Sequence, residues 1–204
     1  MSTNTYFFVD GSSLLADISR INKTKPIVSD KKFSISTFYL HFSRNRKYQH
    51  LVGNGYRRFS IYFVNGENRI DNKLIIPDFR EPNKIEDFNI NYCGKKMEGS
   101  RKVDKWLADN NPPQFMKDRF HKSEKAVDTQ ICCDALQLAA NKKLDRLFLY
   151  TNDYDFMPLI DVLKNMGVNI SLFRLIQDNV NSELVNNFDS FSVPDEKALI
   201  DMFK

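Results

Sequence analysis

Residues 147–163 read LFLYTNDYDFMPLIDVL and contain a strand, a tight acidic turn and the start of a helix. The apolar run 147–150 predicts a buried strand that ends at Thr151. Asp153 and Asp155 follow before the helix begins. In an open α/β sheet, ligands bind in the crevice beyond the carboxyl ends of the strands. Two carboxylates in that place favour a site for a hard cation such as Mg²⁺ or Mn²⁺.

The same two acids also have a purely structural explanation. Asp155 can cap the helix that has Pro158 in its first turn, and Asp153 can be an ordinary turn residue. The segment alone does not choose between capping and metal binding.

The N-terminal segment points to the same edge of the sheet. Residues 6–9, YFFV, predict a strand that ends at Asp10 and Gly11, and a helical run begins at Ser12. A strand that ends in a carboxylate and turns sharply through glycine directs another acid towards the crevice. Asp-Gly pairs are also common turn formers, so this motif is informative only beside the others.

A third contribution comes from residues 124–143, EKAVDTQICCDALQLAANKK. A core-facing stripe recurs here at helical spacing and consists of Val127, Ile131, Ala135 and Leu138. At about 100° per residue, Asp128 and Asp134 lie on opposite flanks of that stripe. The start of the helix lies over the strand carboxyl ends in a right-handed βαβ unit. Asp128 is therefore the better ligand candidate and Asp134, roughly 9 Å further along the axis, a supporting one. The alternative is that both are solvated flank residues.

Taken together, the segments predict that Asp10, Asp128, Asp153 and Asp155 converge from separate elements. Clustered carboxylates repel one another and raise each other's pKa unless a cation lies among them. One or two divalent ions are the economical explanation. Two-metal sites activate water and stabilise the leaving oxygen in phosphodiester hydrolysis.

Three motifs support a family resemblance. They are Asp10-Gly11 after the first strand, Lys125-Ala126-Val127-Asp128 with the later Asp134, and Thr151-Asn152-Asp153-Tyr154-Asp155-Phe156-Met157-Pro158-Leu159. With these motifs the chain resembles the NYN-domain family of PIN-like ribonucleases. The resemblance spans nearly the whole chain, although residues 65–123 are similar only in a general way.

The resemblance implies metal-dependent endonuclease activity on RNA. It implies that Asp10, Asp128 and Asp153 are the main metal ligands and that Asp155 supports them, with Thr151 in the same motif. Two residues depart from the family pattern. Ser13 stands where the family usually has Asn, and Asn152 stands where Gly is common. Both departures concern the placement of the substrate more than metal binding, because every carboxylate is kept.

Basic residues form a candidate RNA-binding cluster, although the net charge of the chain is only +4. It combines cationic side chains with two aromatic rings: Arg44, Arg46, Lys47, His50, Arg57, Arg58, Tyr48 and Tyr56. Such a mixture suits phosphate contacts beside base stacking, with single-stranded or structured RNA as the partner. Lys125 is close enough in sequence to the acids to contact the scissile phosphate or to neutralise the carboxylates. A second basic stretch, residues 95–122, is equally well explained as solvated surface.

Composition sets the remaining bounds. A chain of 204 residues with 42% hydrophobic residues fits one globular domain, residues 1–204, with its own core. No run of eighteen apolar residues and no signal pattern occurs, so we expect a cytoplasmic protein without a membrane segment. The three cysteines form no zinc or disulfide framework. The sequence leaves the oligomeric state open, a homo-oligomer included.

Strand and helix patterns alternate along the chain. Strands are predicted at residues 6–9, 59–64, 74–76, 88–92, 147–150 and 169–175, and helices at 12–21, 36–42, 101–109, from 125, from 156 and at 196–203. This alternation predicts a three-layer α/β/α, PIN-like (Rossmann-like) domain with a mainly parallel central sheet. Residues 65–123 exceed a simple crossover and are interpreted as a flap, an insertion or a partner surface.

A metal-dependent endoribonuclease is the preferred function, with Mg²⁺ or Mn²⁺ as the cofactor. The first alternative is a catalytically silent module that binds RNA or a partner, which the departures at Ser13 and Asn152 favour. The second is an aspartyl-phosphate phosphatase. That chemistry normally uses Asp-x-Asp after the first strand, and Ser12 occupies the position of the second acid here.

Overall fold

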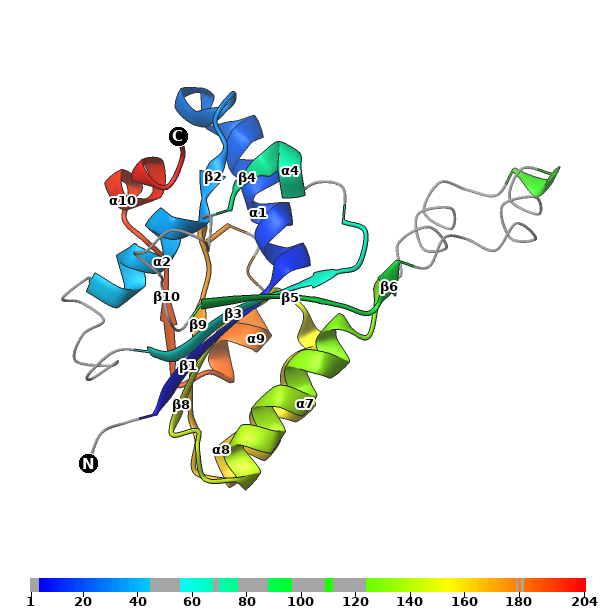
Figure 1. The fold of residues 1–204 in the computed structure, drawn as a ribbon, viewed down its shortest axis with the longest axis vertical. Helices are drawn as coiled ribbons and strands as arrows, with labels where there is room; N and C mark the ends of the chain where they lie inside the picture. Colours follow the sequence, from blue (N-terminus) through cyan, green and yellow to red (C-terminus); the bar gives the residue numbers. More distant parts are fainter. Residues whose placement is uncertain are drawn as a thin grey trace.

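Six parallel strands form the central sheet of the computed structural model (Figure 1). The structure describes residues 4–44, 56–67, 70–76, 88–96, 109–111, 124–178, 180 and 182–204. The sheet strands within these ranges are β1 (Thr5–Asp10), β3 (Tyr56–Val64), β5 (Phe88–Cys93), β8 (Arg146–Tyr150), β9 (Asn169–Phe173) and β10 (Ser190–Ser192). Their spatial order is β10-β9-β8-β1-β3-β5.

The direction of strand addition reverses between β1 and β8. From β1 the chain adds β3 and then β5 on one side, and it returns to add β8, β9 and β10 on the other. In register, Val9 pairs with both Ile61 and Tyr150. The carboxyl ends of β1 and β8 therefore lie next to each other. A reversal of this kind is the place where open α/β sheets bind ligands.

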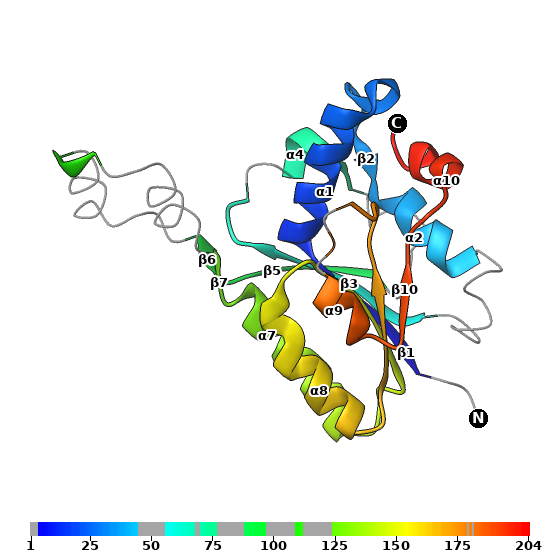
Figure 2. The same cartoon turned by 180° about the vertical axis from the view of Figure 1, so that it is seen from behind.

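Helices cover both faces of the sheet (Figures 1 and 2). One face is covered by α1 (Gly11–Thr24), α2 (Ile35–Arg44), α4 (Ile70–Lys73) and α10 (Glu196–Asp201), and the other by α7 (Val127–Ala140), α8 (Met157–Asn165) and α9 (Ser182–Asn186). Side chains of β1 alternate between the two cores, since Phe7 and Val9 join the first and Phe8 joins the second. This arrangement confirms the predicted three-layer α/β/α fold and its parallel sheet.

The two cores differ in composition. Phenylalanine rings dominate the core under α1 and α2, where Phe7 stacks on Phe59 at 4.6 Å and Phe42 meets Phe173 edge-on at 4.1 Å. Aromatic pairs of this kind contribute about 0.5–1.5 kcal/mol beyond the area they bury. The core under α7 and α8 is mostly aliphatic. Burial on both faces explains why the strands are near-continuous apolar runs.

The remaining elements lie outside the six-stranded sheet. They are η1 (Pro26–Val28), β2 (Phe33–Ser34), β4 (Leu74–Ile75), β6 (Lys95–Lys96), β7 (Glu124–Lys125) and η2 (Tyr154–Phe156). β2 pairs with β4 in parallel, and β6 pairs with β7 in antiparallel fashion.

One predicted helix start is wrong. The helix expected from Lys125 begins at Val127, because Glu124 and Lys125 form β7 and Ala126 has a left-handed backbone with φ of +79°. The helix predicted at residues 101–109 falls almost wholly outside the described residues. Most of the segment 65–123 does so too, and its role as a flap stays a prediction.

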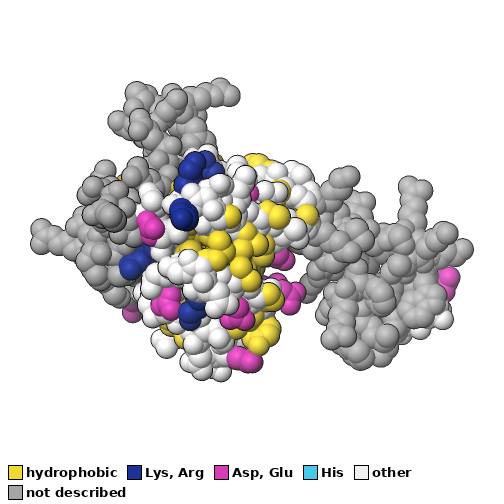
Figure 3. All heavy atoms as spheres, turned by 90° about the horizontal axis from the view of Figure 1, so that it is seen from below, with side chains coloured by type: hydrophobic (Ala, Val, Ile, Leu, Met, Phe, Trp, Pro, Cys, Tyr) yellow, Lys and Arg dark blue, Asp and Glu magenta, His cyan; other side chains and the backbone are white. Residues whose placement is uncertain are grey.

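The described surface also exposes some apolar side chains. Val162 of α8 and Met166, the C-cap residue of that helix, are each 44% exposed. Figure 3 shows hydrophobic side chains gathered on the face seen from below, with acidic side chains beside them. Within the described ranges, no helix is both long enough and apolar enough to cross a membrane.

Candidate functional site

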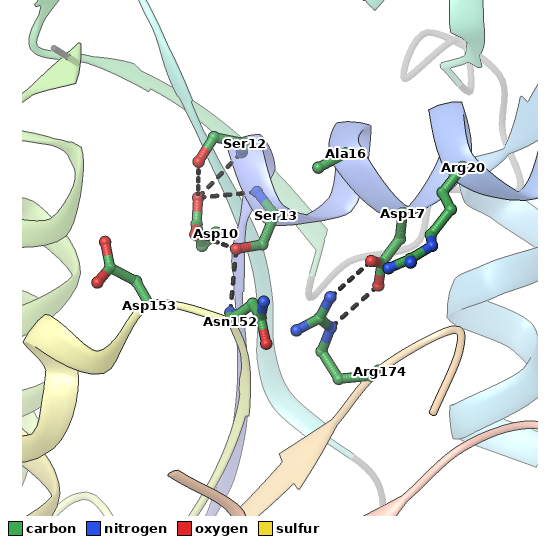
Figure 4. A pocket seen from close by; sticks show the side chains of 9 residues that line it. All are labelled: Asp10, Ser12, Ser13, Ala16, Asp17, Arg20, Asn152, Asp153 and Arg174. Atoms are coloured by element: carbon green, nitrogen blue, oxygen red, sulfur yellow. Dashed lines mark hydrogen bonds and ion pairs between the residues drawn. The ribbon is translucent and has the colours of Figure 1, made fainter. Parts of the chain in front are cut away.

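An open pocket of about 430 Å³ lies at the carboxyl ends of β1 and β8, where the strand order reverses (Figure 4). Its lining residues come from the end of β1, one face of α1, the turn after β8 and the residue after β9: Asp10, Ser12, Ser13, Ala16, Asp17, Arg20, Asn152, Asp153 and Arg174. Two of the four predicted catalytic acids, Asp10 and Asp153, therefore line one pocket.

Asp10 is the most constrained acid of the pocket. Its side chain caps α1 and is 2% exposed. Oδ1 accepts hydrogen bonds from the Ser12 N–H at 2.9 Å, the Ser12 hydroxyl at 2.8 Å and the Ser13 N–H at 3.4 Å. Oδ2 accepts from the hydroxyls of Ser13 at 2.6 Å and Thr151 at 3.4 Å. These donors offset the cost of burying a charged group.

Two hydroxyl groups tie the end of β1 to the turn after β8. The Ser13 hydroxyl donates to Asp10 and accepts from the Asn152 N–H at 3.1 Å. The Thr151 hydroxyl donates to Asp10 and accepts from the Asp153 N–H at 3.0 Å. Both bridges fix the turn that places Asp153 beside Asp10.

Asp153 itself acts as a cap. Its Oδ1 accepts from the Asp155 N–H at 2.9 Å and begins η2. The side chain is half-buried and lines the pocket, whereas Asp155 is exposed and is not among the lining residues. The sequence pattern allowed Asp155 to cap the helix. In the structure Asp153 makes the capping hydrogen bond instead, and Asp153 also lines the pocket.

The two acids of α7 are not among the lining residues of this pocket. Asp134 accepts from the Tyr62 hydroxyl and the Gln130 amide, each at 2.8 Å. Burial, followed by the hydrogen bond to Asp134, raises the pKa of Tyr62 well above its usual value. Asp128 is half-buried in the first turn of α7 and outside the pocket lining.

The thiol of Cys93, at the end of β5, shows which part of the sheet the two acids of α7 lie near. Burial raises the pKa of the Cys93 thiol, and the charges of Asp134 and Asp128 raise it further. Both carboxylates therefore lie within electrostatic reach of the end of β5, while Asp10 and Asp153 lie at the ends of β1 and β8.

Comparison with known families gives a clear result. The sequence model of the NYN domain matches residues 59–195, which is well over half of the chain. The chain belongs to the NYN domain family. NYN domains are a PIN-like nuclease family. The matched region includes Asp128 and Asp153, and Asp10 precedes it.

Two further comparisons concern the whole chain. A crystal structure of a protein of unknown function from Vibrio parahaemolyticus has a similar fold, with a TM-score of 0.52 and 12% identity over 96% of this chain and 94% of that one. At that identity the likeness concerns the fold alone. No curated protein matches the sequence of this NYN domain.

The predicted ligands of the NYN domain are not assembled as a set of three. Within the described part of the chain, no three His, Cys, Asp or Glu side chains form a group that could hold a metal ion. Asp10 and Asp153 share a pocket, and Asp128 lies outside its lining. The roles of these acids in metal binding stay predictions.

The opposite end of the pocket was not predicted from the sequence. Asp17 and Arg174 are 4% and 3% exposed and form an ion pair there, with Nη2 and Oδ1 2.5 Å apart. Each residue interrupts an apolar pattern, Asp17 on the buried face of α1 and Arg174 directly after β9. A charged residue within an apolar pattern was the available signal, since such a residue is almost never buried unless it is paired.

The predicted RNA-binding cluster is described only in part. Arg46, Lys47 and Tyr48 lie outside the described residues, and the backbone alone is described for Arg44, Tyr56, Arg57 and Lys125. Arg58 is exposed near the start of β3, beside Tyr6 of β1. Because the strands are parallel, the start of β3 lies at the sheet edge opposite the pocket. Contact between this cluster and RNA stays a prediction, for a surface apart from the pocket.

Proposed function

We propose that this NYN domain is a metal-dependent endoribonuclease that hydrolyses RNA phosphodiester bonds in the pocket between β1 and β8. One observation supports the proposal most. Asp10 and Asp153, delivered by neighbouring parallel strands, line the same pocket at the point where the strand order reverses. Catalytic and ligand-binding groups in open α/β sheets are found at this place.

The pocket suits a hard divalent ion. Mg²⁺ is commonly held by one or two carboxylates, with substrate phosphate and water supplying the other oxygens. Asp10 and Asp153 provide two carboxylates, and the hydroxyls of Ser12 and Ser13 add neutral oxygens. When bound, Mg²⁺ or Mn²⁺ would polarise the phosphate and activate water for attack. Asp128 is proposed as a further ligand on the strength of the NYN motif that contains it.

The side chains and backbone of the pocket would supply the other functions of the site. Asp10 is buried and held by five hydrogen bonds, so its carboxylate gives a fixed negative charge at the floor of the site. Asp153 is half-buried and can meet both an ion and the substrate. The Asp155 N–H holds Oδ1 of Asp153 and so orients that carboxylate. Preorganised groups of this kind need little rearrangement when charge develops in the transition state.

A second candidate function is binding of RNA or a partner without cleavage. The saturation of Asp10 favours it, because both carboxylate oxygens already accept hydrogen bonds from the chain. The separation of Asp128 from the pocket lining points in the same direction.

Titration of Mn²⁺ with end-labelled single-stranded RNA separates the two functions. We expect metal-dependent products from the native protein and a loss of at least about 100-fold in rate for Asp153→Asn, since removal of one preorganised polar group from an active site can cost 10²–10³-fold. Asp161→Asn is the matched control, because Asp161 is exposed on α8 and outside the pocket lining. It should cleave at the native rate.

Two results would contradict the nuclease proposal. In one, Asp153→Asn keeps full metal-stimulated activity in a preparation whose circular dichroism matches the native protein. In the other, native protein retards the RNA at every Mn²⁺ concentration and yields no products, which favours the binding module.

A further inference from the structure

Charge is sorted along the length of the pocket (Figure 4). Asp10 and Asp153 lie at one end, and Arg20 and Arg174 lie at the other with Asp17. The acidic end has a formal charge of −2 and the basic end a formal charge of +1, counted over these lining residues. The proposed function uses only the acidic end.

One face of α1 forms the wall that joins the two ends. Ser13, Ala16, Asp17 and Arg20 stand at positions i, i+3, i+4 and i+7 of one helix face and all line the pocket. Arg20 lies seven positions after Ser13, which corresponds to about 10 Å along the helix axis. Ala16 lies between them and is exposed. A ligand with two charged groups can therefore reach both ends along this wall without meeting a large side chain.

Arg174 gives the basic end a fixed geometry. It is 3% exposed, and Nε and Nη2 donate to Asp17 at 2.9 and 2.5 Å while Nη1 donates to the Thr151 carbonyl at 3.2 Å. These three bonds use three of the five N–H donors that a guanidinium has. A buried guanidinium held in this way presents its remaining edge to the pocket. It would lose little conformational entropy when it binds a ligand. Arginine is also the side chain best matched to phosphate oxygens.

Arg20 supplies the second cation of this end. It is half-buried on α1, and its side chain lies beside Asp17 in the pocket wall (Figure 4). Together, Arg20, Arg174 and Asp17 carry a formal charge of +1 at this end of the pocket. A single phosphodiester group has the matching charge.

We propose that Arg20 and Arg174 bind a phosphate of the RNA strand adjacent to the phosphate held at Asp10 and Asp153. The strand then runs along the wall formed by α1, with Ala16 under the sugar between the two phosphates. This inference rests on the proposed function for the identity of the first phosphate. It adds a direction for the strand and a second phosphate subsite.

The test measures binding rather than cleavage. Affinity is measured with Ca²⁺ in place of Mn²⁺ for a short single-stranded RNA and for copies in which one phosphate at a time is a neutral methylphosphonate. The native protein should lose roughly tenfold or more in affinity at one position next to the cleavage site, the effect of one hydrogen-bonded charge. Arg20→Gln should lose a similar factor with the unmodified RNA and become insensitive to that methylphosphonate.

Further variants of the same chain sharpen the result. The salt dependence of Arg20→Gln should fall by about 0.7 in log–log slope, the value for one phosphate contact on a single strand. Ala16→Leu should weaken binding by obstructing the wall, while its helix propensity stays close to that of alanine. Lys143→Gln makes the same charge change in the turn before β8, at the opposite sheet edge, and should behave as the native protein.

The outcomes distinguish this inference from the proposed function. Native affinity in Arg20→Gln, or an undiminished response of that variant to the methylphosphonate, would overturn the second subsite even where Asp153-dependent cleavage is observed. If Arg20→Gln removes the sensitivity to the methylphosphonate but no cleavage of RNA is observed, the second subsite is supported and the nuclease proposal is contradicted. If a free nucleoside monophosphate binds through Arg20 and the RNA does not, the strand assignment is wrong.

Discussion

Arg174 and Asp17 form a buried ion pair that joins the segment after β9 to the middle of α1, with Nη2 and Oδ1 2.5 Å apart. The Tyr150 hydroxyl donates to the same carboxylate at 2.5 Å, and Arg174 also donates to the Thr151 carbonyl at 3.2 Å. The pair therefore connects α1, β8 and β9 directly beside the pocket. A substitution of either Asp17 or Arg174 should therefore alter the conformation of the turn that contains Asp153.

Removal of one partner should strongly destabilise the fold. Arg174→Met removes the guanidinium that donates hydrogen bonds to the buried Asp17 carboxylate, and breaking such a pair typically costs about 3–5 kcal/mol. Urea denaturation followed by circular dichroism measures the loss. The control is Glu196→Gln, which breaks the exposed ion pair with Lys25. That variant should shift the midpoint little, because water already screens exposed charges. Equal effects of the two substitutions would contradict the structural role given to Arg174.

Gly11 should tolerate no side chain. A Cβ atom built on Gly11 would lie 2.2 Å from Cδ1 of Phe63 and 2.5 Å from the Tyr62 carbonyl oxygen. The carbonyl belongs to the backbone of β3 and cannot rotate away, so Gly11→Ala must displace the start of α1. We expect a loss of about 1–3 kcal/mol, the usual cost of overpacking, together with weaker capping by Asp10. Thermal unfolding measures the first effect.

Gly66→Ala is a useful comparison for that substitution. Gly66 has φ of +75° and no atom within 4 Å of a built Cβ, so its cost is backbone strain alone. Cleavage should be impaired in Gly11→Ala and unaffected in Gly66→Ala. Normal activity of Gly11→Ala would mean that α1 can shift without moving Asp10.

The sequence predicted the scaffold of the site because the relevant signals are local. The run 147–150 is apolar on both faces, and an acidic turn and Pro158 follow it within a few residues. These features predicted β8, the turn and α8. The same local logic found β1 with Asp10 at its end. The role of Gly11 was predicted for the wrong reason, since it is needed for close approach to β3 rather than for a sharp turn.

Features that depend on partners distant in sequence could not be predicted. Asp17 and Arg174 are 157 positions apart in the sequence, and the sequence around one of them does not indicate that the other is its partner. Arg58 was predicted from charge to contact RNA, and its place at the sheet edge opposite the pocket depends on strand direction, which charge does not give. Asp128 was placed by helix phase, and phase does not give the distance from α7 to the pocket.

Ser13 and Thr151 should be energetically coupled. Both hydroxyls donate to Oδ2 of Asp10, and each also accepts a backbone N–H from the turn after β8. Ser13→Ala and Thr151→Val should each cost about 1–3 kcal/mol, because each leaves a buried N–H or carboxylate oxygen with fewer partners. A double-mutant cycle should give an interaction energy of about 0.5–3 kcal/mol, as for residues of one hydrogen-bond network. Strict additivity would show that Asp10 does not link them.

Cys132 can report whether Asp128 binds a metal ion. Burial raises the pKa of the Cys132 thiol to about 11, with a further contribution from the charge of Asp128. A raised pKa keeps the thiol protonated at neutral pH, so alkylation should be slow and should accelerate as the pH approaches 11. Asp128→Asn removes a negative charge, lowers this pKa and should speed alkylation at pH 8.

The decisive comparison adds Mn²⁺ to a Cys93→Ser, Cys133→Ser background, in which Cys132 is the remaining thiol. An ion bound at Asp128 neutralises the carboxylate, so Mn²⁺ should accelerate alkylation of Cys132 in this background and have no effect once Asp128→Asn is added. Asp161→Asn serves as the control and should retain the response to Mn²⁺, since Asp161 does not contribute to the Cys132 shift. If the rate is the same with and without Mn²⁺, Asp128 is not a ligand, and any ion in the pocket is held by Asp10 and Asp153 without it.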